Sequence, residues 1–178
     1  MFRNLFVSVV VAGLCISAWS QAKPVAEAGR WQVGVGVSVG LPDYAPSSYI
    51  TGGSLFATYD IGSRYGLVVE AHDLNLSTPK GVGQTSFLIG PHYGFSQGRF
   101  HFYVKVLAGA GLLQRHAGFY ASNTTDVYEV FAGGWGMEYA LTHHLNLRLL
   151  DFEYQAWPGV KPNGLTPWVG TYGVNYRF

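Results

Sequence analysis

The sequence predicts an all-β fold, an eight-stranded antiparallel up-and-down transmembrane β-barrel. Only 12% of its 178 residues are charged and 48% are hydrophobic, whereas a soluble domain carries roughly 25% charged residues. Yet beyond the first twenty or so residues no stretch is apolar over the length of about 20 residues that a membrane helix needs. Only helices and closed barrels satisfy their backbone polar groups in lipid, so a barrel is the membrane fold that remains.

Residues 1–22 are predicted to be a cleaved signal peptide. A positive start, an apolar stretch and a small-residue region follow one another there. Cleavage after Ser20 and cleavage after Ala22 fit equally well. The only cysteine, Cys15, falls inside this segment. Residues 23–178 are therefore expected to form one exported barrel domain without a disulfide.

The first strand is expected at residues 30–41. Val33 and Val35 share one face there, while Gly34 and Gly36 share the other. This period of two runs over about ten residues, the length with which a tilted strand crosses a bilayer. The other strands are expected at residues 53–61, 65–76, 84–95, 99–112, 127–140, 144–156 and 168–178.

The alternation is clearest again in residues 65–76, 99–112 and 168–178. In each segment apolar residues occupy one parity, and small or polar residues occupy the other. A single such strand also suits a soluble sheet. Its recurrence along the chain favours a membrane barrel, with apolar residues toward lipid and the other parity toward the lumen.

One strand, residues 144–156, breaks the pattern. Arg148 and Asp151 lie on opposite parities there. A β-bulge near Leu149 and Leu150 would turn both charges into the lumen. Alternatively, Asp151 begins a part of the strand that extends into water.

Short and long connections alternate along the chain. The short ones are expected at 61–64, 96–98 and 141–143, and the long ones at 42–52, 77–83, 113–126 and 157–167. This asymmetry is typical of bacterial outer-membrane barrels, whose short turns and both termini lie in the periplasm.

Aromatic residues are expected to form a girdle at each membrane surface, because their rings prefer the headgroup level. The periplasmic girdle would comprise Trp31, Tyr59, Tyr65, Tyr93, Phe95, Phe102, Tyr139, Tyr176 and Phe178. The outer girdle would comprise Tyr44, Tyr154, Trp157 and Trp168.

The last eight residues carry a motif. Thr171, Gly173, Tyr176 and Phe178 occupy the positions of a polar residue, a glycine, an aromatic residue and a terminal phenylalanine. This pattern resembles the C-terminal β-signal of outer-membrane proteins. Together with the strand layout, it makes the chain similar to the small eight-stranded family typified by the barrel domain of outer-membrane protein A. The resemblance implies a monomer in the outer membrane of a Gram-negative bacterium, in contact with lipid and lipopolysaccharide. It also implies recognition of the last strand by the outer-membrane assembly machinery.

Charged and histidine side chains on the inward parity are the candidate functional residues. They are Asp60, Glu70, His72, His92, Lys105, Glu138, Arg148, Glu153 and Arg177. An eight-stranded barrel is just wide enough for side chains to fill, so buried charges there must pair. We expect Lys105 to pair with Glu70 or Glu138, and Arg148 with Glu138 or Glu153. Alternatively, these residues form the selective lining of a narrow channel.

Enzymatic function is not expected. Barrels of the lipid A deacylase type use a histidine with a serine two residues on, and no histidine here has one. No catalytic, cofactor-binding or metal-ligating residue is predicted, and the adjacent His143 and His144 are expected to be solvated in a turn. The net charge of +1 offers no basic field for nucleic acid.

The favoured function is therefore a structural or surface-interaction barrel, with the loops at 42–52 and 113–126 as its outer contacts. A narrow porin-like channel is the first alternative. A lipid A-modifying enzyme and a soluble, lipocalin-like barrel with an apolar interior are less favoured.

Overall fold

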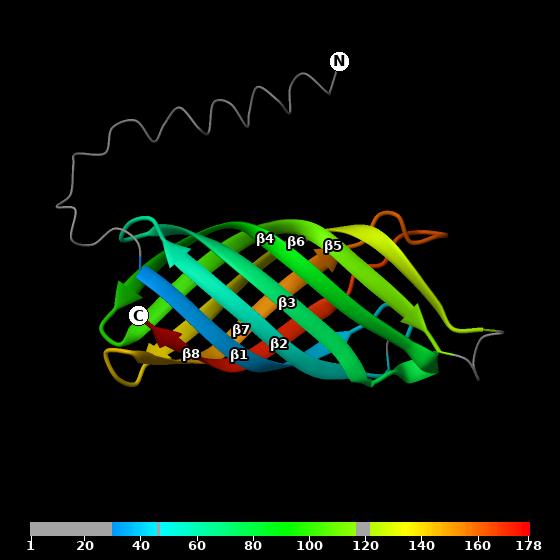
Figure 1. The fold of residues 1–178 in the computed structure, drawn as a ribbon, viewed down its shortest axis with the longest axis horizontal. Coiled ribbons are helices and arrows are strands. Elements are labelled where there is room, and N and C mark those ends of the chain that lie inside the picture. Colours follow the sequence, from blue (N-terminus) through cyan, green and yellow to red (C-terminus); the bar gives the residue numbers. More distant parts are fainter. Residues whose placement is uncertain (1–29, 46, 117–121) are drawn as a thin grey trace, which may run out of the picture.

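In the computed structural model, which describes residues 30–45, 47–116 and 122–178, eight antiparallel strands form one closed barrel (Figure 1). The strands are β1 (Arg30–Leu41), β2 (Ile50–Asp60), β3 (Tyr65–Ser77), β4 (Val82–Gln97), β5 (Phe100–Arg115), β6 (Thr124–Ala140), β7 (Leu145–Ala156) and β8 (Trp168–Arg177). Each strand pairs with the next, and β1 pairs with β8. The predicted fold class is thus confirmed, while the predicted signal peptide lies outside the described residues.

The ends of the barrel differ as the sequence predicts. The three short connections lie at the end where β1 begins and β8 finishes, on the left of Figure 1, and the longer ones lie at the other end. A single 3₁₀ turn, Pro79–Gly81, lies in the connection between β3 and β4. Across the described residues, no helix has the length and apolar character needed to cross a bilayer.

Several strands continue beyond their predicted ends toward the long loops. β5 and β6 stay paired as far as Arg115 and Thr124. Arg115 and Asp126, expected in a loop, are therefore strand residues. Backbone pairing does not need apolar side chains, so the ladder extends past the point where the alternation of hydrophobicity ends.

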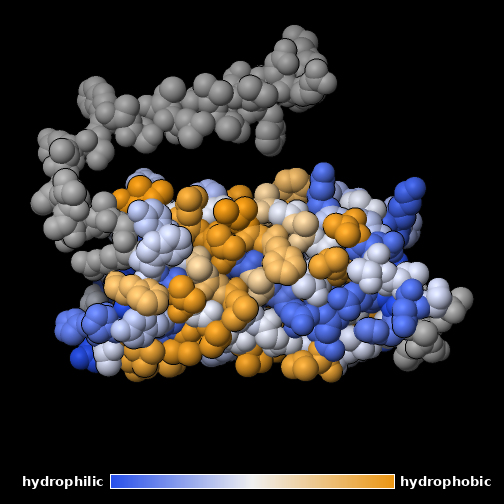
Figure 2. All heavy atoms as spheres, viewed as in Figure 1, coloured by the Kyte–Doolittle hydropathy of each residue, from blue (hydrophilic) through white to orange (hydrophobic). Residues whose placement is uncertain are grey.

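The outer surface of the barrel is apolar. Val37, Leu55 and Val106 are all more than half exposed, and Val106 reaches 67%. Figure 2 shows hydrophobic side chains gathered over the middle of one face, with hydrophilic side chains toward the long-loop end. An exposed apolar surface this large is unfavourable in water and suits contact with lipid.

Aromatic pairs lie near both ends of this surface. Trp31 contacts Tyr59 with ring centroids 4.9 Å apart, and Tyr154 contacts Trp168 at the same separation. The prediction that Trp157 belongs to the outer girdle is wrong. Its side chain is 1% exposed and lies inside the barrel. Tyr44 is likewise partly buried against interior apolar residues rather than set on the outer face.

The bulge predicted in β7 is confirmed. Leu150 pairs with Met137 and Arg148 pairs with Glu138, so one extra residue lies between them on β7. On the other side of the strand the register with β8 shifts over the same residues. Arg148 and Asp151 consequently both point into the lumen. The bulge changes the parity of all later β7 residues, and this carries Trp157 inward as well.

Candidate functional site

Arg148 lies at the centre of the lumen and contacts three carboxylates. Its Nη1 donates to Glu70 Oε1 at 2.8 Å and to Asp151 Oδ2 at 3.0 Å, while its Nε donates to Glu138 Oε1 at 3.2 Å. The guanidinium carbon also lies 3.5 Å from the centroid of the Phe56 ring. Arg148 is only 3% exposed, so these contacts replace the water that the charge loses on burial.

Lys105, on β5, supplies the second buried cation. Its Nζ donates to Glu70, lies 2.8 Å from Asp151 Oδ1 and lies 3.2 Å from Glu153 Oε2. The Tyr103 hydroxyl donates to Asp151 Oδ2 at 2.5 Å. We call the group formed by Glu70, Lys105, Glu138, Arg148, Asp151 and Glu153 the charged layer.

Each cation forms an ion pair with one of the two carboxylates expected from the sequence. Lys105 pairs with Glu70, and Arg148 pairs with Glu138. The alternatives, Lys105 with Glu138 and Arg148 with Glu153, do not occur among the ion pairs of the described residues. Asp151 contacts both cations, and no predicted pair included it. The bulge was the signal that could have identified Asp151 as a partner.

His72 lies beside the charged layer. Its Nδ1 is 3.3 Å from Ser38 Oγ, which in turn lies 2.7 Å from Thr171 Oγ1. Its Nε2 lies 3.8 Å from both Glu70 Oε2 and Glu153 Oε1. The sequence predicts no metal ligand, yet ligand atoms of Glu70, His72 and Glu153 all come within 4.8 Å of one another.

His92 and Arg177 lie apart from the charged layer, near the short-turn end. His92 Nε2 is 3.3 Å from Asp60 Oδ1, and Arg177 Nη2 is 3.8 Å from Asp60 Oδ2. Gln32 donates to the same carboxylate at 3.1 Å. A cavity of about 190 Å³ opens beside these side chains. The inward polar residues therefore form two groups.

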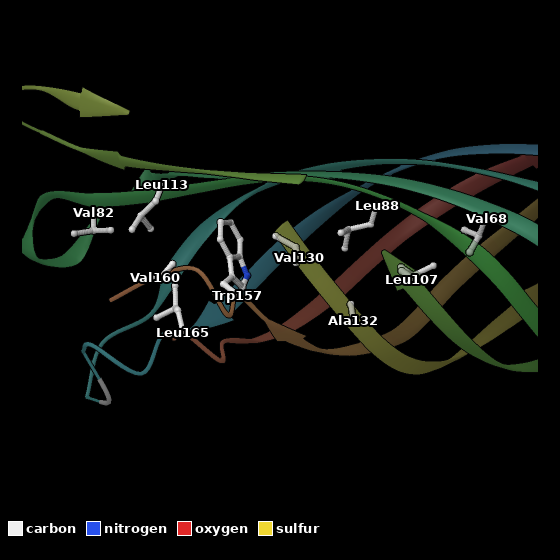
Figure 3. Close-up of a cluster of buried hydrophobic side chains, with 10 residues drawn as sticks. All are labelled: Val68, Val82, Leu88, Leu107, Leu113, Val130, Ala132, Trp157, Val160 and Leu165. Carbon is white, nitrogen blue, oxygen red and sulfur yellow. The ribbon is translucent and has the colours of Figure 1, made fainter. Parts of the chain in front are cut away.

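The lumen toward the long loops is apolar, whereas the sequence predicts small or polar side chains there. Val82, Leu113, Val130, Trp157, Val160 and Leu165 pack together there and are called the apolar plug. Figure 3 shows this cluster continuing along the lumen to Val68, with Trp157 near the loop that carries Val160 and Leu165. The expectation of small or polar residues on the inward parity is therefore wrong for this part of the barrel. The physical reason is that the loop of residues 157–167 folds into the lumen and needs apolar partners.

A row of hydrogen bonds along β7 joins the two regions. Trp157 Nε1 donates to Gln155 Oε1 at 3.0 Å, and Gln155 Nε2 donates to Glu153 Oε1 at 2.6 Å. These residues share one parity, so they follow one another on the inner wall.

The residues of the C-terminal motif lie on both faces of β8. Thr171 and Gly173 face the lumen, whereas the rings of Tyr176 and Phe178 meet on the outside with centroids 5.1 Å apart. The backbone N–H of Phe178 donates to the carbonyl of Trp31 at 3.0 Å, so the last residue is tied to β1.

The long-loop end holds a pocket of about 420 Å³ lined by residues of several connections. At its rim Arg115 forms an ion pair with Asp126, and Asp43 accepts a hydrogen bond of 2.6 Å from the backbone of Thr166. Phe119 and Tyr120, within the connection predicted at 113–126, lie outside the described residues.

The fold is similar to those of several solved barrels. Ail, the attachment invasion locus protein of Yersinia pestis, solved in complex with the heparin analogue sucrose octasulfate, is 15% identical at a TM-score of 0.58, covering 85% of this chain and 99% of Ail. Neisserial surface protein A is 16% identical at a TM-score of 0.61, and the match covers 84% of this chain and 97% of that protein. The outer membrane protein OprG from Pseudomonas aeruginosa is 14% identical at a TM-score of 0.62, and the match covers 85% of this chain and 97% of OprG. No family model matches the sequence, and the search of curated proteins found no match.

At these identities the likeness concerns the fold alone. The chain has the fold of small eight-stranded outer-membrane barrels, as the sequence predicts. The apolar outer surface agrees with that fold and with the expected location, the outer membrane of a Gram-negative cell.

Proposed function

We propose that the chain is a non-conducting outer-membrane anchor that presents its long loops at the cell surface. The observation that supports this most directly is the double closure of the lumen. The charged layer fills its middle, and the apolar plug fills it toward the loops.

Little space is left on the short-turn side of the charged layer for a permeating solute. The cavity beside Lys105 and Arg148 measures about 20 Å³. That volume holds about one water molecule. Cations and carboxylates also contact one another there, so these side chains occupy the lumen instead of lining an open path.

Planar bilayers test the closure directly. Purified protein reconstituted at increasing concentration should give no steady openings, and its current should stay at that of the lipid alone. Steady, ion-selective openings would overturn the proposal and favour the narrow channel.

The contact surface outside the cell is proposed to suit a protein partner of mixed polarity rather than a polyanion. Ail is described in complex with a sulfated sugar. Here the cation of Arg115 is already paired with Asp126, and Lys80 donates to the backbone carbonyl of Tyr44 at 2.5 Å. Retention of the folded protein on immobilised heparin at physiological salt would contradict this part of the proposal.

Recognition of β8 by the outer-membrane assembly machinery is proposed from the motif that ends in Phe178. Deleting Phe178 should lower the folded amount in the outer membrane and leave chain for periplasmic proteases to degrade. Phe95→Ala, which removes another exposed aromatic side chain near the same end, is the matched control. An equal loss in both variants would point to a general effect of lost aromatic surface.

We further propose that the chain has no enzymatic activity. Ser38, His72 and Glu70 have the residue types of a catalytic triad, and sequence spacing could not have shown this because they come from two strands. Ser38 is 0% exposed, however, so a lipid substrate has no access to it. Mass spectra of lipid A from cells with and without the protein should be identical.

A further inference from the structure

We infer that Glu70, His72 and Glu153 bind one divalent transition-metal ion inside the lumen. The three side chains come from β3 and β7, which lie on different parts of the barrel wall. One ligand atom of each lies within 4.8 Å of the other two, and all three residues are buried.

The histidine ring is oriented for such a role. Ser38, itself in contact with Thr171, lies at Nδ1 and leaves Nε2 directed at the two carboxylates. A hydrogen-bonded partner on the second ring nitrogen is the usual companion of a metal-binding histidine. The 3.8 Å separations from Nε2 to the carboxylate oxygens are too long for hydrogen bonds. They are slightly wider than the roughly 3.4 Å between two ligands of a tetrahedral ion with bonds of about 2.1 Å.

Two atoms of this group lack hydrogen-bond partners. His72 Nε2 and Glu153 Oε2 are both buried, and within the described residues neither forms a hydrogen bond. Glu153 Oε2 faces Lys105 Nζ at 3.2 Å but without hydrogen-bond geometry. Buried polar atoms without a partner are rare in folded proteins, and a metal ion between them would give both a ligand bond.

The charge of the surroundings favours a divalent cation. The four carboxylates of the charged layer face only two permanent cations, Lys105 and Arg148. Two negative charges are therefore left uncompensated among residues that are at most 5% exposed. An unpaired buried charge is strongly disfavoured, and one divalent ion would compensate both.

The ligand types indicate the class of metal. Two carboxylates with one imidazole suit borderline ions such as Zn²⁺, whereas Ca²⁺ and Mg²⁺ prefer oxygen ligands alone. Lys105 lies next to the site and competes with the ion for Glu70 and Glu153. Its removal should therefore tighten metal binding.

The first experiment measures zinc on the wild-type protein. The barrel is stripped with a chelator, refolded in detergent, incubated with equimolar Zn²⁺ and passed over a desalting column. Elemental analysis should find one zinc per chain, and X-ray absorption at the zinc edge should show one imidazole with oxygen ligands. Retention of well under one zinc would overturn the inference and leave His72 to bridge the two carboxylates with a proton.

Variants then assign the ligands. His72→Gln and Glu153→Gln should weaken zinc binding by more than the roughly 10–100-fold that loss of an orienting neighbour costs, and Ser38→Ala should fall within that range. Lys105→Met should bind at least as tightly as the wild type. His143→Gln and His144→Gln, in the exposed turn between β6 and β7, are the matched controls and should keep the zinc. Migration of unheated samples on gels checks that each variant is folded. Zinc that is lost from the turn variants but kept by His72→Gln would place it on the surface and overturn the inference.

Discussion

The charged layer and the apolar plug close the same lumen in different ways. In the charged layer each side chain has specific partners, as Arg148 has in Glu70, Glu138 and Asp151. In the plug, the Trp157 side chain packs against apolar neighbours, and its indole N–H donates to Gln155. The stability of the first region depends on every partner being present, whereas that of the second depends on filled volume.

Their positions along the barrel fit this difference. The charged layer lies within strands whose outer faces contact lipid, so its groups have little access to water and must compensate one another. The plug lies nearer the long loops, and the loop of residues 157–167 supplies half of it. Apolar side chains need no fixed geometry of partners, so a connection of irregular backbone can provide them.

The largest effect is expected from Arg148→Met. The change leaves three carboxylates without their shared cation and should lower the free energy of unfolding by about 3–5 kcal/mol. Urea unfolding of the protein in detergent, followed by tryptophan fluorescence, measures the loss. Arg115→Met is the matched control, because its ion pair with Asp126 is 27% and 45% exposed and should contribute roughly 0–1 kcal/mol.

A second variant tests whether the loss of stability in Arg148→Met comes from the uncompensated charge. Adding Glu138→Gln to Arg148→Met should restore part of the lost stability, since it removes one of the uncompensated charges. Equal losses in the Arg148 and Arg115 variants would show that water reaches the charged layer and that its pairs are no stronger than those at the surface.

A somewhat smaller effect is expected from Trp157→Ala. Removing this buried ring should cost about 3 kcal/mol, the lower end of the range for a large aromatic side chain, because the site is near the water-exposed end. The variant should still give no steady current in planar bilayers, since the charged layer continues to fill the lumen. Trp168→Ala, on the outer face, is the control of the same residue type. Openings from Trp157→Ala alone would show that the plug, and not the charged layer, closes the barrel.

The smallest effect is expected from Gln155→Leu, which breaks the link between the two regions. It leaves Trp157 Nε1 and Glu153 Oε1 without their shared partner and should cost about 1–2 kcal/mol. A double-mutant cycle with Trp157→Phe, which removes the indole N–H, tests the coupling. Strictly additive losses would show that the two regions are energetically independent.

The sequence by itself determined the strands and their lipid-facing parity, and it predicted the bulge in β7 as one of two alternatives. Each of these depends on neighbours in the chain. Val33 and Val35 alternate with glycines because each strand must present an apolar face to lipid, whichever strands it pairs with. Arg148 and Asp151 indicated the bulge because both charges had to reach the same side of one strand.

Only the tertiary structure decided which inward residues meet. Arg148 contacts Glu70, which is 78 positions away in the sequence and on the opposite side of the barrel, and Lys105 contacts Asp151, which is two strands away. Parity says that a side chain points inward, but its partner is fixed by the stagger of the strands around the closed barrel. The position of Trp157 and its apolar partners was missed for a related reason. Its inward direction followed from the bulge, but its packing depends on how a long loop folds back into the lumen, and no local pattern in the chain encodes that contact.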